Sequence, residues 1–350
     1  MGLKQKCDLT IKDAQYPYCA NGSAAIIFSV LFGITFIAHL TQAILYRKRF
    51  CWVIVVGSAW ECLGLIMRTY STLDQTKSTT AAAGQLLVLL APLWINAFVY
   101  MIFGRMVYYF TPDKRVKRIK AESLAKIFIW LDIIAFIIQA TGGIMASDFS
   151  NRMNAIGFHI YTAGIAVQEF FILCFCGLLV MFHRRMILGY GSIERGPQWK
   201  VMVICMYITL LCLTTRIIYR LVEFADTDKA GKLPLSTKEA PFYCLECVPI
   251  FCAMLLWNIF HPGRMMPGAD SEFPKMSRKE RKQMKREAKE AKKLGPGGTK
   301  YTPFSSDYHL TRNSDEGHGE MPTACSDGRY YNEARWPLNE METGRGGYVR

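Results

Sequence analysis

The sequence lacks the residue patterns of a recognisable energy-coupling or catalytic centre. It contains no G-x-x-x-x-G-K-[ST] motif, which excludes nucleotide hydrolysis at a P-loop. His39 and His159, which lie within apolar stretches, do not have the spacing of zinc ligands. Residues 1–22 are polar and lack the apolar core of a cleavable signal peptide, so we expect the first apolar stretch to direct insertion. We predict a protein that is not an enzyme and that has no metal and no cofactor.

Charge is scarce in the first part of the chain, and apolar residues are scarce in the last. The chain is 51% apolar and carries a net charge of +14, a combination that fits a membrane protein whose charge lies outside its apolar runs. A helix needs about 20 apolar residues to cross the hydrocarbon core, and seven stretches have that length. They are approximately Ser23–Tyr46, Cys51–Thr72, Ala82–Phe110, Ile127–Ser147, Ala155–Phe182, Val201–Phe224 and Ala240–His261. The short alternating segments of a membrane β-barrel are not present, so we predict an all-α, polytopic protein with seven transmembrane helices.

Basic residues gather in every second joint between these stretches. Residues 47–49, 114–126 and 184–200 are rich in Lys and Arg, whereas the second and fourth joints are nearly uncharged. The sixth joint is mixed in sign and weakens the pattern. Because cytoplasmic joints carry the excess of Lys and Arg, we predict an amino terminus outside and a carboxyl terminus in the cytoplasm. The predicted parts are an extracellular segment 1–22, a membrane domain 23–264, a basic segment 265–294 and a disordered tail 295–350.

The predicted terminal segments suggest modifications and one surface contact. Cys7 and Cys19 would lie in an oxidising compartment, where they either form a disulfide or remain free thiols. Asn21 begins a glycosylation sequon close to the bilayer. The basic run 275–293 is either a solvated helix that reinforces the topology or a segment attracted to the anionic inner leaflet. We expect no binding to nucleic acid, because the tail is tethered to a membrane.

Charged and polar residues within the apolar stretches are the candidate functional site. Such residues are costly in lipid and mark either a pathway or a buried pair. The candidates are Glu61, Arg68, Asn96, Gln168, Glu169, Arg216, Arg220, Glu223 and Glu246. Arg220 and Glu223 have i, i+3 spacing and are expected to pair. The set is either a self-neutralising network that fixes helix packing or a polar cavity that receives the head group of an amphipathic ligand. Nearer the inner face, Arg105 and Asp132 are expected to lie at similar depth and to form an ion pair.

Two well-known kinds of seven-helix protein are disfavoured by missing residues. The seventh stretch has no Lys, which excludes a retinal Schiff base of the rhodopsin kind. The third stretch does not end in an acidic-Arg-aromatic triplet, and the seventh has no Asn-Pro-x-x-Tyr, so the motifs of a G-protein-coupled receptor are missing.

Several motifs, in order along the chain, resemble one known family. The third stretch reads LLAPLWINAFVYMIFGR over 89–105, and the fourth carries Asp132 followed by QATGG from Gln139. The sixth reads RIIYRLVEF over 216–224, and the seventh closes with HPGR at 261–264. With Glu61 and Arg68, these motifs resemble the fungal lipid-translocating exporter family, whose RTA-like members are named for resistance to aminocholesterol. The likeness covers about 23–264. That family more often has Asp where Glu246 stands and a third Gly after Gly143.

The resemblance implies a protein of the plasma membrane, or alternatively of a vacuolar or other internal membrane. It implies that the chain binds and translocates or exports amphipathic lipids, such as a sphingoid base, a phospholipid or a sterol-like toxin, and so confers resistance to lipid or drug stress. The alternative is a receptor-like lipid sensor that signals through its cytoplasmic joints and tail. A membrane-embedded lipid enzyme is disfavoured because the sequence offers no nucleophile or metal set. The expected partners are membrane lipids.

Overall fold

A computed structural model of the chain describes residues 20–73, 78–117, 119–146, 151–189, 196–227, 238–268, 272–273 and 286. Within these residues it contains seven helices that are long and apolar enough to cross a membrane, as the sequence predicted. Six are the α-helices α1 (Gly22–Tyr46), α2 (Trp52–Leu73), α3 (Ser78–Phe110), α4 (Ala121–Ala146), α5 (Asn151–Ile187) and α6 (Gln198–Thr227). The seventh begins as a π-helix, η3 (Phe242–Cys247), and continues as α8 (Val248–Ile259). The protein is therefore an all-α integral membrane protein.

Four short elements lie beside the long helices in the sequence. A 3₁₀ turn, η1 (Arg49–Cys51), leads into α2, and a short helix, α9 (Pro262–Met265), follows α8. The strands β1 (Arg115–Val116) and β2 (Ile119–Lys120) form an antiparallel hairpin between α3 and α4. The bundle belongs to a compact unit that spans Met1–Lys275, and Met276–Arg350 forms a second unit. The predicted disulfide residues Cys7 and Cys19, the tail 295–350 and, apart from Arg286, the basic run 275–293 lie outside the described residues.

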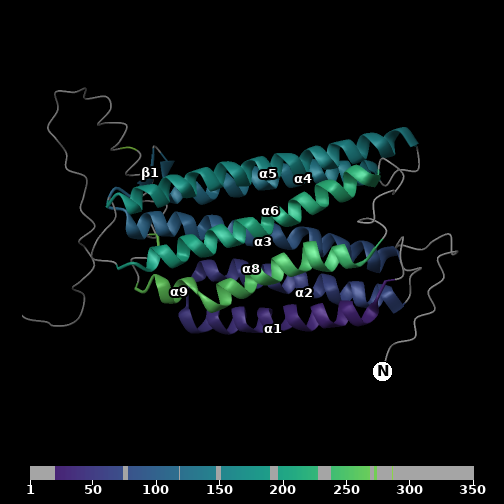
Figure 1. The fold of residues 1–350 in the computed structure, drawn as a ribbon, viewed down its shortest axis with the longest axis horizontal. Helices are drawn as coiled ribbons and strands as arrows, with labels where there is room; N and C mark the ends of the chain where they lie inside the picture. Colours follow the sequence, from purple (N-terminus) through teal and green to yellow (C-terminus); the bar gives the residue numbers. More distant parts are fainter. Residues whose placement is uncertain are drawn as a thin grey trace, which may run out of the picture. The chain divides into compact units, whose positions relative to one another are not determined.

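The seven helices form a closed bundle in which α8 returns to contact α1. Consecutive helices pack against one another from α1 to α6, and α8 contacts both α6 and α1 (Figure 1). We name the two ends of the bundle after the residues that flank α1, the Asn21 end and the Tyr46 end. Asn21 caps α1, since its Oδ1 accepts hydrogen bonds from the backbone N–H groups of Ser23 and Ala24. The orientation of these ends relative to the membrane remains a prediction.

Glycine lets two helix pairs approach closely, α2 with α3 and α4 with α5. A Cβ added to Gly142 of α4 would collide with the backbone of Tyr161, and one added to Gly157 of α5 would collide with the backbone of Ala146. On the other pair, a Cβ on Gly64 would lie 2.8 Å from a side-chain carbon of Val88. Small residues at helix contacts are typical of membrane bundles, where close van der Waals packing drives association. The two helices of each pair are therefore closely packed against each other within the bundle.

Large apolar side chains cover the outside of the bundle. Ile37 of α1, Trp130 and Ile144 of α4 and Leu211 of α6 are all more than half exposed, and Ile144 is 74% exposed. The interior at the Tyr46 end holds aromatic rings, with Tyr100, Phe103, Phe128, Phe175 and Phe182 in mutual contact between α3, α4 and α5. An apolar exterior of this extent suits a lipid environment.

Candidate functional site

Four charged residues meet inside the bundle in the half toward the Asn21 end. We call them the arginine cluster: Arg216, Arg220 and Glu223 of α6 and Glu246 of η3. Arg216 Nη2 lies 2.9 Å from Glu246 Oε1, and Arg220 pairs with the same oxygen. Arg220 Nη1 also lies 3.0 Å from Glu223 Oε2, the i, i+3 pair expected from the spacing. Because Arg216 and Arg220 are one helical turn apart, one buried carboxylate can neutralise part of the charge of both.

A proline in α3 supplies a further acceptor for Arg216. Pro92 has no N–H, so the carbonyl of Val88, four residues earlier, lacks its usual helical donor. Arg216 Nη2 donates to that carbonyl oxygen at 2.8 Å. Proline therefore exposes an acceptor in the middle of a helix, and the arginine of α6 uses it to connect α6 to α3.

Gln85 of α3 makes a second connection to α6. With its amide oriented so that the oxygen faces Arg220, that oxygen accepts from Nη1 and Nη2 of Arg220, each at 3.0 Å. The two arginines of α6 thus contact α3 at positions 85 and 88, one turn apart, while their carboxylate partners come from η3 and α6.

A second ion pair lies closer to the Asn21 end. Arg68 Nη2 of α2 lies 3.5 Å from Glu239 Oε1, and the guanidinium of Arg68 stacks 3.9 Å from the ring centroid of Phe242. Glu239 also accepts from the backbone N–H of Asn21 at 2.6 Å and from the hydroxyl of Tyr243 at 3.1 Å. Glu239 therefore links the starts of α1 and η3 to the end of α2. Sequence reasoning treated Glu239 as a joint residue and did not place it in the site.

Glu61 of α2 differs from the other carboxylates of this region. Its side chain is 0% exposed, and neither carboxyl oxygen has a hydrogen-bond partner among the described residues. It shares a face of α2 with Gly57 and Gly64, both of which press against α3. Its strongest electrostatic interaction is with Arg216. Arg68 therefore pairs with a carboxylate from outside α2, whereas Glu61 is buried without a hydrogen bond or ion pair to any described residue.

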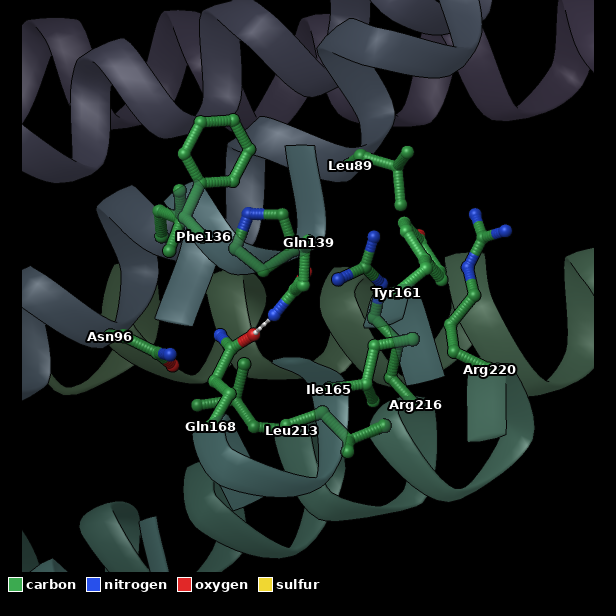
Figure 2. A pocket seen from close by; sticks show the side chains of 13 residues that line it. Leu89, Asn96, Phe136, Gln139, Tyr161, Ile165, Gln168, Leu213, Arg216 and Arg220 are labelled. Carbon is green, nitrogen blue, oxygen red and sulfur yellow. Dashed lines mark hydrogen bonds between the residues drawn. The ribbon is translucent and has the colours of Figure 1, made fainter. Parts of the chain in front are cut away.

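A small cavity of about 30 Å³ lies between α3, α4, α5 and α6, beside the arginine cluster (Figure 2). Its polar lining is formed by Asn96, Gln139, Tyr161, Gln168, Arg216 and Arg220. Figure 2 shows Arg216 and Arg220 extending side by side from α6, and Gln139 Nε2 donates to Gln168 Oε1 at 2.8 Å. A cavity of this size holds about one water molecule, whereas small-molecule sites occupy about 300–1,000 Å³. The cavity in this conformation is therefore too small for a lipid head group.

The predicted pair between Arg105 and Asp132 is not formed. Asp132 Oδ2 accepts from Asn96 Nδ2 at 3.0 Å and from the Tyr100 hydroxyl at 3.1 Å. Arg105 donates to the carbonyl of Met101 and stacks over the ring of Phe50, 4.1 Å from its centroid. The expectation was wrong because Arg105 lies five residues beyond Tyr100, which is about 7.5 Å further along α3.

The other predicted site residues divide between the cluster and its surroundings. Asn96 and Gln168 line the cavity, and Asn96 also connects the cavity to Asp132. Glu169 accepts from Thr214 Oγ1 at 3.0 Å and forms no ion pair with any described residue. The structure therefore brings Arg216, Arg220, Glu223 and Glu246 together and leaves Glu169 apart from them.

A closed bundle of seven apolar helices with ion pairs and a polar cavity inside it defines an integral membrane protein whose site lies within the membrane-spanning region. The family described as RTA1 like protein matches residues 54–269. The chain therefore belongs to the RTA1-like family. No solved structure matches it.

Named relatives are fungal. The chain is 41% identical over 274 residues to a protein of Emericella nidulans named probable lipid transporter atnI, a match that covers 75% of this chain and 71% of the relative. It is 26% identical over 206 residues to protoporphyrin uptake protein 1 of Saccharomyces cerevisiae, covering 58% of this chain and 65% of the relative. It is 22% identical over 287 residues to the sphingoid long-chain base transporter RSB1 of S. cerevisiae, covering 71% and 73%.

Proposed function

We propose that this protein moves amphipathic lipids between the leaflets of its membrane, and that it does so without chemical catalysis. The observation that carries the proposal is the arginine cluster beside a polar cavity inside a lipid-facing bundle. Relatives named as a lipid transporter and a sphingoid base transporter support the same activity. We place the amino terminus outside and the tail in the cytoplasm on the pattern of basic joints. On the resemblance to its family we place the protein in the plasma membrane, with a vacuolar or other internal membrane as the alternative.

The geometry suggests where a lipid enters. The closest packing joins α2 to α3 and α4 to α5, whereas α6 contacts α3 at few points. Arg216 and Arg220 make the polar contacts between α6 and α3. Separation of α6 from α3 and α4 would enlarge the cavity and turn both guanidinium groups toward it. A phosphate or carboxylate on the lipid would then bind the arginines, and an amine would bind the carboxylates.

Reconstitution of the purified full-length chain into liposomes tests the proposal. The probes are fluorescent phosphatidylcholine and a fluorescent sphingoid base, whose head groups differ in charge. We expect the protein to transfer at least one of them between leaflets, and Arg216→Ala to abolish the transfer while the variant remains folded in detergent. Arg184→Ala, an exposed arginine at the Tyr46 end of α5, is the matched control and should transfer lipid at the wild-type rate.

Binding of either probe without transfer between leaflets would contradict the proposal. The lipid-sensor alternative would then explain the binding. No transfer and no binding of either probe would reject both functions for these lipid classes.

A further inference from the structure

Apart from the half-buried Glu169, which accepts a hydrogen bond from Thr214, three arginines and four carboxyl groups lie buried or half-buried in the part of the bundle toward the Asn21 end that the structure describes. Arg68 pairs with Glu239, and Arg216 and Arg220 pair with Glu246 and Glu223. Each arginine therefore has one carboxylate to balance its charge, and Glu61 is in excess. Ionisation of Glu61 in this conformation would leave one negative charge uncompensated inside the membrane.

The burial of Glu61 makes that ionised form unfavourable here. The side chain is 0% exposed, and both carboxyl oxygens lack a hydrogen-bond donor in the described part of the chain. An isolated ionised carboxylate in an apolar medium costs far more than an unpaired neutral group, and such a group takes up a proton instead. The neutral, protonated carboxyl is the form that this arrangement accommodates.

The groups around Glu61 offer one route to ionisation. α6 contributes Arg216 and Arg220, and η3 contributes Glu246 and Cys247 as the titratable groups that interact with it. The helices that flank α2 contribute apolar side chains to a buried hydrophobic cluster that contains Leu65 of α2: Phe32 from α1 and Val88 and Ile95 from α3. Since Arg220 also pairs with Glu246, Arg216 is the cation that can turn to Glu61 while Glu246 stays paired.

We propose that Glu61 is a proton-binding site, and that loss of its proton transfers Arg216 from Glu246 and the Val88 carbonyl to Glu61. The proton passes to water, and Arg216 pairs with the carboxylate that remains. The excess negative charge is then shared by Glu246 and Glu223, which both pair with Arg220, and Glu223 is 25% exposed to solvent. That transfer breaks one contact between α6 and α3 beside the cavity. Proton release would thus be linked to opening of the cavity, and a proton gradient would drive lipid movement. The inference rests on the proposed function for its link to lipid.

Infrared difference spectroscopy of the full-length protein in lipid films tests the proton site directly. A titration from neutral to alkaline pH observes only buried carboxyl groups, because exposed ones are already ionised at neutral pH. We expect a protonated-carboxyl band that disappears on titration in the wild type and is missing in Glu61→Gln. Glu122→Gln, which changes an exposed carboxyl at the start of α4, should keep the band. Asp132→Asn separates any contribution of Asp132, a buried carboxyl that forms no ion pair with a described residue. A Glu61→Gln spectrum identical to the wild-type spectrum would overturn the proposal.

Proteoliposomes with an imposed pH gradient test the coupling. With the two fluorescent lipids as probes, the wild type should move lipid at different rates under inward and outward gradients. Glu61→Gln, which imitates the protonated group, should lose that difference. A wild type that moves lipid equally under both gradients overturns the coupling. A wild type that moves no lipid under any gradient rejects the proposed function and the coupling with it, while the infrared band still decides whether Glu61 binds a proton.

Discussion

Glu246 is the residue on which the arginine cluster depends most. One of its oxygens is shared by Arg216 and Arg220, and its side chain is 0% exposed. It also lies in a π-helix, an irregular element that is frequent at functional sites. Removal of the negative charge would leave two buried guanidinium groups with Glu223 as their remaining carboxylate in the cluster.

We expect Glu246→Gln to destabilise the protein by about 3–5 kcal/mol, the usual cost of removing one partner of a buried ion pair. Thermal unfolding in detergent measures the change. Glu122→Gln is the matched control, and a surface change of this kind should alter stability by less than about 0.5 kcal/mol. If both variants have the melting temperature of the wild type, Glu246 does not stabilise the arginine cluster.

The residue scale also shows where sequence reasoning reaches its limit. The spacing of Arg220 and Glu223 predicts a pair that the structure contains, because both residues lie on one helix. The expected pair of Arg105 with Asp132 failed, because the depth of residues on two different helices depends on how the helices slide past each other. Glu239 was missed because it stands just before its helix, where an acidic residue is typical of a solvent-exposed joint.

At the scale of elements, length and hydropathy were sufficient to place all seven spans, since each must cross the same hydrocarbon thickness. The contacts between spans were less predictable. The QATGG motif gives no indication of which helix Gly142 contacts, and the structure shows a close approach to α5. The use of the Val88 carbonyl by Arg216 requires both Pro92 and a specific rotation of α6, which no single helix specifies.

The α4–α5 contact leads to a prediction with an internal control. Gly142→Ala places a methyl group against the backbone of Tyr161, which cannot yield as a side chain can. We expect a loss of about 1–3 kcal/mol from overpacking. Gly177→Ala of α5 meets nothing within 4 Å and should be neutral or stabilising by up to about 1 kcal/mol, because alanine favours the helix. Unfolding of the two variants in detergent, compared side by side, measures the difference, and equal stability would rule out close packing at Gly142.

At the scale of the whole molecule, a short segment after α9 is part of the bundle unit. Glu272 Oε1 accepts from the backbone N–H of Arg49 at 3.4 Å, and the ring of Phe273 lies against Tyr108, with centroids 5.2 Å apart. Lys48 Nζ donates to the carbonyl of Gly268 at 2.6 Å. The membrane domain was predicted to end at residue 264. Gly268, Glu272 and Phe273 contact the bundle beyond that residue, within a compact unit that spans Met1–Lys275.

Two truncations test this boundary. A chain that ends after Lys275 should keep the wild-type melting temperature and the wild-type rate of lipid transfer. A chain that ends after Met266 should lose about 1 kcal/mol or more, since full burial of a Phe side chain contributes roughly 1.5–3 kcal/mol. Loss of lipid transfer in the chain that ends after Lys275 would show that residues 276–350 take part in transport.

The dependence of α6 on η3 has a consequence for biosynthesis. Arg216 and Arg220 precede Glu246 by 30 and 26 residues, so both reach the membrane before it. An arginine at the centre of an isolated helix costs about 2.5–3.5 kcal/mol on insertion scales, and the cost falls toward the end of the helix. Arg216 and Arg220 lie in the second half of α6 and carry part of this cost. We therefore expect α6 to insert inefficiently by itself, and to integrate into the bilayer together with the last membrane helix, η3 and α8.

Glycosylation mapping of nascent chains tests this order. A chain that stops after Asp226 should leave α6 outside the bilayer more often than one that continues to Met266. Equal integration of α6 in the two chains would mean that Glu246 is not needed for insertion. The contacts of Arg216 and Arg220 with α3, including the Val88 carbonyl, would then be sufficient.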